Sequence, residues 1–230
     1  MTTTADAVRR WVRPAAFLVL LVAGVVLMAG CGDEGEPVET STEGGPGTPS
    51  QDAPRPDVDF VAEVTPGAEA IAVSWTLTNT SQARMLVVDR VPRASGAGLV
   101  QDPQATYVVG GEGRLVQLTQ RLYDEPETTM SFAQPPTAGA TELGPGETLQ
   151  RDLAVPLPLE RLSPWGNDLG DGPIELPDPV TSVQFCLGVL AGDPQPSWGP
   201  GAEGDVVVLD HGSPAVAAQH VLCSDPTPVG

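Results

Sequence analysis

The 230-residue chain contains no lysine, two histidines, three cysteines and only 4% aromatic residues. Its 11 basic residues are therefore all arginine, against 30 Asp and Glu, and the formal net charge is −19. Nucleic-acid binding needs clustered cations that displace counterions from phosphates, so we expect no nucleic-acid partner. The same charge repels anionic lipid headgroups, so the folded part is not expected to bind a membrane by electrostatics.

Sequence signatures of catalysis are also missing. The chain after the first 30 residues has no Gly-x-Ser-x-Gly, His-Glu-x-x-His or Ser-x-x-Lys motif. His211 and His220 flank a Gly-Ser-Pro turn at a spacing that does not suit a zinc site, and we predict that both are exposed near a hairpin. We therefore predict a protein that is not an enzyme, with no catalytic residue, no metal site and no cofactor.

One oxygen-rich stretch leaves two interpretations open. Residues 167–172 read Asn-Asp-Leu-Gly-Asp-Gly, and Glu175 follows closely. Calcium needs several oxygens that converge from one loop, but the stretch lacks the regular Asp-x-Asp-x-Asp-Gly spacing. Asn, Asp and Gly are also the ordinary turn formers. We favour a turn and keep a calcium loop as the alternative.

The N-terminus carries the strongest motif. Arg9, Arg10 and Arg13 precede an apolar run over residues 15–27, which ends in Leu-Met-Ala-Gly-Cys at residues 27–31. Cations before an apolar stretch give an N-in orientation, and small residues before Cys31 give a peptidase access to the backbone. The motif closely resembles a lipobox, the processing site of bacterial lipoproteins.

The resemblance implies a diacylglyceryl group on Cys31 and cleavage between Gly30 and Cys31. The expected location is then the extracytoplasmic face of the cell membrane, with the membrane as a partner through the lipid on Cys31. The alternative is an uncleaved membrane helix, for which the run is shorter than the roughly 20 residues that a span prefers. The absence of lysine, whose codons are AT-rich, favours a high-GC source such as an actinobacterium.

The remaining chain divides into two parts. Residues 31–56 are acidic, rich in Gly, Ser, Thr and Pro, and nearly free of large apolar side chains. Such a segment cannot bury enough surface to offset the entropy of ordering, so we expect a lipidated Cys31 and a disordered tether. Residues 1–30 are the predicted signal peptide, and residues 57–230 are the predicted folded domain.

Short alternating runs dominate this domain. In residues 69–80, Ile71, Val73, Trp75 and Leu77 share one face and small polar residues share the other, which predicts a half-buried strand. Further candidate strands cover residues 58–64, 85–91, 105–109, 114–123, 148–155, 180–190, 205–209 and 219–223. We predict an all-β fold, an antiparallel β-sandwich of about eight or nine strands, which loosely resembles immunoglobulin-like domains of exported bacterial proteins.

Cys186 and Cys223 form an even pair if Cys31 is lipidated. In an oxidising compartment such a pair favours a structural disulfide. A redox function would favour a Cys-x-x-Cys pair or a neighbouring cation, and neither is present in the sequence. Alternation places Cys186 opposite Val183, Phe185 and Leu187, so the bridge is expected at the periphery if those three residues are core.

Two tryptophans, Trp165 and Trp198, lie in Pro- and Gly-rich connections. Rigid rings on long loops are typical contact hot spots, so both are candidate partner contacts. The alternative is that each ring folds back over the edge of the sandwich. The connections over residues 156–179 and 192–204 are long for a compact sandwich, and long loops often carry function.

These observations give three functional hypotheses. The first is a membrane-anchored envelope lipoprotein whose non-catalytic sandwich binds another exported protein or scaffolds an assembly. The second is a carrier or sensor for a small ligand, either a lipid or a cation. The third, which the sequence favours least, is an envelope hydrolase.

The anchor is testable by substitution. In the native host, Cys31→Ser should abolish incorporation of labelled palmitate and leave residues 1–30 attached, because the modified thiol is gone. Intact-mass measurement of the membrane fraction reports both effects. The double variant Cys186→Ser/Cys223→Ser should keep the label, and labelling of the Cys31→Ser protein would contradict the lipobox.

Overall fold

In the computed structural model, the described residues are 55–96, 98–129, 132–169 and 173–230. The chain divides into two units, residues 1–42 and 43–230, and every described residue belongs to the second. The predicted signal peptide, Cys31 and all of the tether before residue 55 lie outside the described residues. Within the described part of the chain, no helix is long and apolar enough to cross a membrane.

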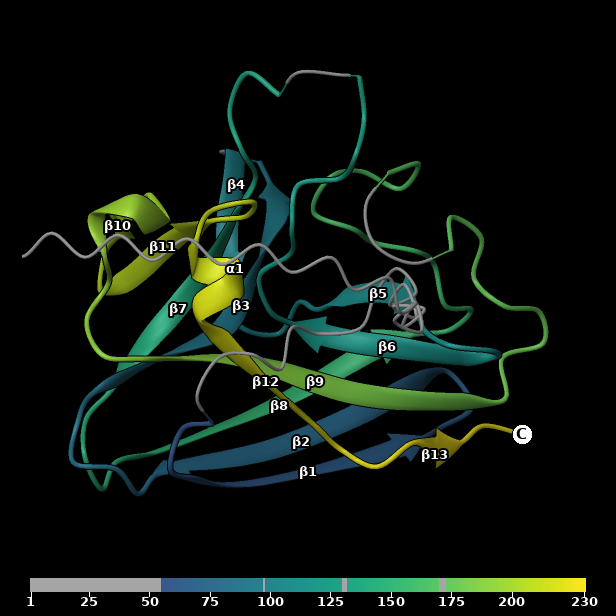
Figure 1. The fold of residues 1–230 in the computed structure, drawn as a ribbon. Coiled ribbons are helices and arrows are strands. Elements are labelled where there is room, and N and C mark those ends of the chain that lie inside the picture. The colour runs from purple at the N-terminus through teal and green to yellow at the C-terminus, as the bar shows by residue number, and fades with distance from the viewer. Residues whose placement is uncertain (1–54, 97, 130–131, 170–172) are drawn as a thin grey trace, which may run out of the picture. The chain divides into compact units, whose positions relative to one another are not determined.

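The described domain is an all-β sandwich (Figure 1), which confirms the predicted fold class. Its described residues form more strands than the eight or nine expected. They are β1 (Val58–Pro66), β2 (Ala70–Asn79), β3 (Met85–Ser95), β4 (Gly98–Asp102), β5 (Tyr107–Gly110), β6 (Leu115–Gln120), β7 (Thr137–Leu143), β8 (Thr148–Pro156), β9 (Ser182–Ala191), β10 (Gly201–Glu203), β11 (Val206–Asp210), β12 (Gln219–Cys223) and β13 (Thr227–Pro228). A 3-10 turn, η1 (Pro196–Trp198), and one short helix, α1 (Ala215–Ala218), complete it.

The smaller sheet has the order β1-β2-β8 and is antiparallel throughout. The alternation in β2 behaves as predicted: Ile71, Val73, Trp75 and Leu77 are all buried, and the intervening residues lie on the outer face. Strand alternation sends successive side chains to opposite faces, so one sequence pattern fixes both the core face and the solvent face.

The larger sheet has the order β10-β11-β7-β3-β9-β6-β5, with β12 and β13 also paired to β9 and β4 to β3. The pair β6–β9 is parallel, a departure from the expected antiparallel sheet. Gly188 pairs with both β3 and β12, and Leu187 pairs with both β6 and β12. A strand has two edges. β12 therefore occupies one edge of β9, and β3 and β6 follow one another along the other edge.

Strand β9 is covered on both faces. Phe185 and its neighbours on one face join the core between the two sheets, where Phe185 stacks on Trp75 of β2 with ring centroids 6.3 Å apart. Leu190, on the other face, joins a second apolar cluster with α1 and Trp198. Because both faces are buried, the strand is apolar almost throughout.

The place where β3 gives way to β6 along β9 is closely packed over Gly188. A Cβ added to Gly188 would lie 2.5 Å from Oε1 of Gln219 and 3.2 Å from Cα of Arg121. The Gln219 amide is itself fixed, because Oε1 accepts the Leu122 N–H at 3.0 Å and Nε2 donates to the Leu122 carbonyl at 2.7 Å. This position therefore requires glycine because of its neighbours.

The substitution Gly188→Ala should destabilise the domain by about 1–3 kcal/mol, the usual range for overpacking a tight core. The matched control is Gly96→Ala, since nothing lies within 4 Å of a Cβ there. Urea unfolding of the full chain should show a lower midpoint for the first variant and an unchanged one for the second. Equal midpoints would contradict the packing at this junction.

Candidate functional site

The predicted disulfide is present. Cys186 of β9 and Cys223 of β12 face each other directly in the strand register and are bonded. Val183, Phe185 and Leu187 are core, as expected. Cys223 is exposed, but Cys186 is fully buried, so the bridge is peripheral at one end only, in contrast to the expectation. The bond fastens β12 to β9 in the larger sheet.

Both candidate tryptophans are buried, each with 6% of its surface exposed. The Trp165 ring packs on Phe132, with centroids 4.7 Å apart, and Trp198 joins the second apolar cluster through η1. Gly199 follows η1 with φ +63°, a left-handed conformation that ends the turn. Neither ring is exposed, so neither is available as a surface contact, and each folds back onto the domain as in the alternative above.

The prediction that His211 is exposed is wrong, because only 1% of its surface is accessible. Its ring fills the space among Tyr107, Tyr123 and Trp165. The Tyr123 backbone N–H donates to Nδ1 at 3.0 Å, and Nε2 lies 2.9 Å from the Tyr107 hydroxyl. Nδ1 accepts, so the proton of the neutral ring sits on Nε2.

The surroundings of His211 keep it neutral. Burial, followed by the nearby Arg121 guanidinium, lowers its pKa to about 3. Both ring nitrogens are committed to structural bonds, so this histidine has no nitrogen left to act as a general base. His220, nine residues after His211, lies half-buried on β12 and is not one of the residues that contact the His211 ring. In the described parts of the chain, no three His, Cys, Asp or Glu side chains form a metal-ligand group.

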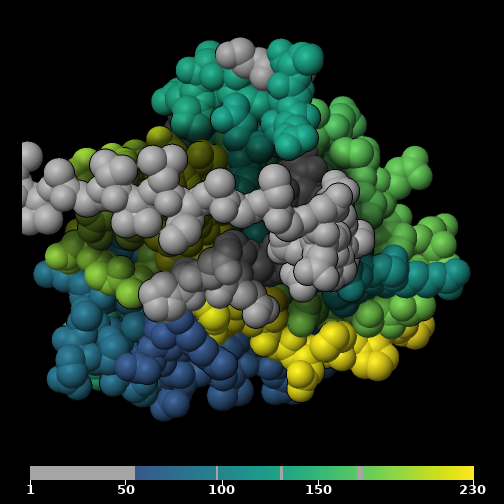
Figure 2. All heavy atoms as spheres, viewed as in Figure 1, coloured from purple at the N-terminus to yellow at the C-terminus, as the bar shows by residue number. Residues whose placement is uncertain are grey.

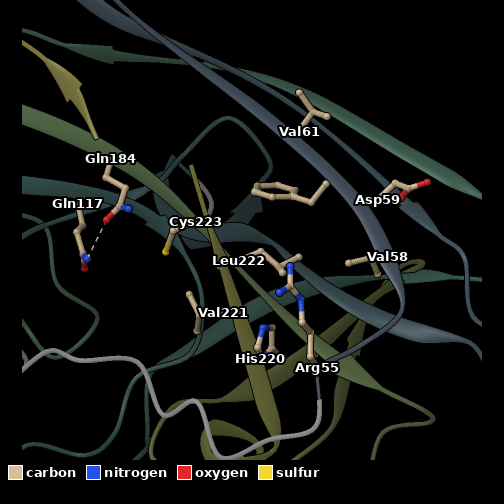
Figure 3. Close-up of a pocket in the computed structure, with 11 residues that line it drawn as sticks. Arg55, Val58, Asp59, Val61, Gln117, Gln184, His220, Val221, Leu222 and Cys223 are labelled. Atoms are coloured by element: carbon tan, nitrogen blue, oxygen red, sulfur yellow. Dashed lines mark hydrogen bonds between the residues drawn. The ribbon is translucent and has the colours of Figure 1, made fainter. Parts of the chain in front are cut away.

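A groove of 830 Å³ lies between β1 and β12 (Figure 3). Its lining mixes apolar side chains such as Leu222 with polar ones, and Cys223 forms part of the wall. Figure 3 shows Arg55 and His220 along one side, while Gln117 and Gln184 face each other on another with 3.5 Å between amide nitrogen and oxygen. This mixed lining favours no single class of ligand.

The connection between β8 and β9 forms the right-hand side of Figure 1, in green. It is long for a connection in a compact sandwich, and two sets of contacts hold it in place. Leu162 exchanges two backbone hydrogen bonds with Val108 of β5, each 2.9 Å long. These bonds attach the loop to the edge of the larger sheet.

Arg161 is the second attachment of this loop. Its buried guanidinium donates to the carbonyl oxygens of Pro173, Gly166, Asn167 and Leu169 at 2.5–3.2 Å. Residues 170–172 of the proposed calcium stretch lie outside the described residues. The carbonyls beside them nevertheless converge on a cation supplied by the chain itself, which favours the turn interpretation over a calcium loop.

Three large apolar side chains of the connection between β8 and β9 are exposed. They are Leu157, Leu162 and Ile174, with 37%, 41% and 47% of their surfaces accessible. We call these three residues the loop face. The green residues of this connection protrude along the right of the molecular surface in Figure 2.

Two recesses open beside the loop face, and Leu157 and Pro158 line both. The first, of 460 Å³, is mainly apolar and includes Leu176, Val180 and Val229. We call it the apolar pocket. The second, of 530 Å³, runs between the end of β8 and β5 and includes Leu162 and the more polar Arg93. Exposed apolar groups beside an apolar recess are typical of binding surfaces.

No family model matches this chain, and neither a curated protein nor a solved structure matches it. Function therefore has to be argued from the surface itself. The loop drew notice in the sequence for its length, but Trp165, the contact candidate within it, is buried. In the sequence, Arg161 is a single basic residue within a long loop. The apolar residues of the loop face show neither strand nor helix periodicity, so no stronger signal for either was present in the sequence.

If Arg161 holds the loop, Arg161→Met should leave its carbonyl partners without donors and loosen residues 163–169 and 173–175. We expect faster amide exchange and new protease cleavage there, with a global loss of about 1–3 kcal/mol. Arg114→Met is the matched control, because Arg114 is exposed. Unchanged exchange in the Arg161 variant would show that the loop is held by other contacts.

Proposed function

We propose that this chain is a lipoprotein of the bacterial cell envelope, anchored through Cys31 on the extracytoplasmic face of the membrane. Its non-catalytic, immunoglobulin-like sandwich binds another exported protein, or scaffolds an assembly, through the loop face. The anchor rests on the lipobox resemblance of residues 27–31. It would hold the sandwich at the membrane on its acidic tether.

The observation that carries the binding function is the loop face. Leu157, Leu162 and Ile174 expose apolar surface on a long connection that Arg161 and the Leu162 backbone hold to the domain. A held loop loses little entropy on binding, so its contacts contribute more of their energy to affinity. A few well-packed residues supply most of the energy of a protein interface, so three exposed side chains on a held loop are enough to anchor one.

A small apolar ligand is the alternative. The apolar pocket, at 460 Å³, falls in the size range of small-molecule sites, roughly 300–1,000 Å³. A carrier or sensor function would use this pocket with the loop face as its rim. A hydrolase gains least support, because the bonds made by the His211 ring are structural.

The test is capture from solubilised envelope with the lipidated full chain as bait. The triple variant Leu157→Ser/Leu162→Ser/Ile174→Ser should lose a protein that the wild type enriches. The matched control is Val61→Ser/Leu99→Ser, since Val61 and Leu99 are exposed apolar residues outside the loop. Quantitative mass spectrometry compares the three baits.

The control bait should retain the protein as well as the wild type does. Equal loss from both variants would show that exposed apolar area anywhere is enough, and would contradict a specific face. If no bait enriches a protein, the binding function is wrong, and native mass spectrometry of the purified chain would then test the apolar-ligand alternative.

A further inference from the structure

We infer that the partner of the loop face presents a positively charged segment, one of whose apolar side chains enters the apolar pocket. The inference rests on the proposed function and adds the chemistry of the partner to it. It is carried by the charges around the loop face and by the shape of the pocket.

The exposed charges of this loop have one sign. Glu160, Asp168, Glu175 and Asp178 are all exposed, and Asp178 lines the apolar pocket itself. Among the described residues of the loop, the one cation is Arg161, and it is buried against backbone carbonyls. Among its described residues, the loop therefore exposes only carboxylates as charged groups. The exposed Arg93 of β3 lines the second recess with Glu160, but its guanidinium is paired with Asp102 at 3.2 Å.

Glu69 adds another exposed carboxylate, and we call these five carboxylates the acidic rim. The Leu157 N–H donates to the carbonyl of Glu69 at 2.9 Å, which places the exposed Glu69 next to the loop face. Apolar contacts with a charged rim select partners by sign, because like charges brought together across an interface reduce affinity and opposite charges speed association. The rim thus favours lysine or arginine on the partner.

The pocket sets the second requirement. Its floor is Ile71 of the core, and its walls include Leu176, Val180 and Val229. A recess of 460 Å³ with this lining accepts a leucine-, methionine- or phenylalanine-sized group. A purely basic segment would leave it unfilled, and a purely apolar one would leave the rim carboxylates unpaired, so the two features together define an apolar residue flanked by basic ones.

The same charges argue against two other occupants. A second copy of this chain would bring two acidic rims together, in a protein whose net charge is already −19. An anionic lipid surface would be repelled in the same way. Both occupants nevertheless appear as separate outcomes of the test.

The test uses the lipidated full chain in phosphatidylcholine nanodiscs and three labelled peptides of equal length. One alternates Arg with Leu, the second alternates Arg with Ser, and the third alternates Glu with Leu. Fluorescence anisotropy, with empty nanodiscs as blank, should show the tightest binding for the Arg-Leu peptide. Its affinity should fall as salt is raised, because rim charges are screened.

Two triple variants separate local from global charge. Glu160→Gln/Glu175→Gln/Asp178→Asn should weaken the Arg-Leu peptide by about tenfold, the effect of three exposed ion pairs of ordinary strength. The control Asp59→Asn/Glu63→Gln/Glu112→Gln removes the same charge from exposed residues outside the loop and should change little. Equal weakening by both variants would overturn the inference, because bulk charge would then explain the binding.

Other outcomes also decide against it. Equal binding of the Glu-Leu peptide would show that charge does not select the partner. Tighter binding to phosphatidylglycerol vesicles than to the Arg-Leu peptide would assign the face to a membrane, and concentration-dependent dimerisation lost with the loop-face variant would assign it to a second copy.

The inference can fail while the proposed function stands. Envelope capture with the Glu160/Glu175/Asp178 variant distinguishes the two. If this variant keeps a protein that the loop-face variant loses, the binding function survives and the charge requirement is wrong. If neither capture nor any peptide depends on the loop face, both are wrong.

Discussion

The structure depends on strand β9, which is hydrogen-bonded on both edges and covered on both faces. Four strands pair with it, and one of its edges is divided between β3 and β6. At this division β3 separates from β9 after Val88 but still pairs with β7 at Arg90. That division allows only glycine at residue 188 and places the parallel pair in an otherwise antiparallel sheet. The disulfide joins β12 to β9 as well. The main core and the second apolar cluster both pack on β9, one on each face.

Where β3 leaves β9, polar groups are buried and have to be paired. The Asp89 carbonyl accepts a hydrogen bond from Gln120 at 3.0 Å, which replaces the missing strand partner. The Asp89 carboxylate reaches the other sheet, where Arg151 of β8 donates to it at 2.6 and 3.0 Å. Burial nevertheless raises the pKa of Asp89, because desolvation outweighs the attraction of Arg151. This pair links β8 to β3, and β8 leads directly into the loop that carries the loop face.

The sequence predicted those features that depend on local pattern. The alternation in β2 identified its buried face residue by residue, and a pair of cysteines in an oxidising context identified the disulfide. It could not predict β9 as the centre, because a strand buried on both faces shows no alternation. His211 was misassigned for a related reason: a polar residue beside a Gly-Ser turn is usually exposed, and only the distant Tyr107 and Tyr123 create its buried position. Arg161 likewise acquires its function from carbonyls that only the folded loop brings together.

The loop between β8 and β9 begins and ends on the two strands whose positions are most restricted. Trp165 of this loop is buried in a third apolar cluster, and Leu159 and Leu176 pack against the main core, whereas the three side chains of the loop face remain exposed. The Arg161 guanidinium adds to this burial by satisfying the loop carbonyls. Buried side chains and the hydrogen bonds to Arg161 together hold the loop, so the three side chains of the loop face are not needed to order it. Arg161 holds this loop from within, while its carboxylates and the loop face point outward. Because the loop is already ordered, it loses little conformational entropy when a partner binds, which suits it to recognition.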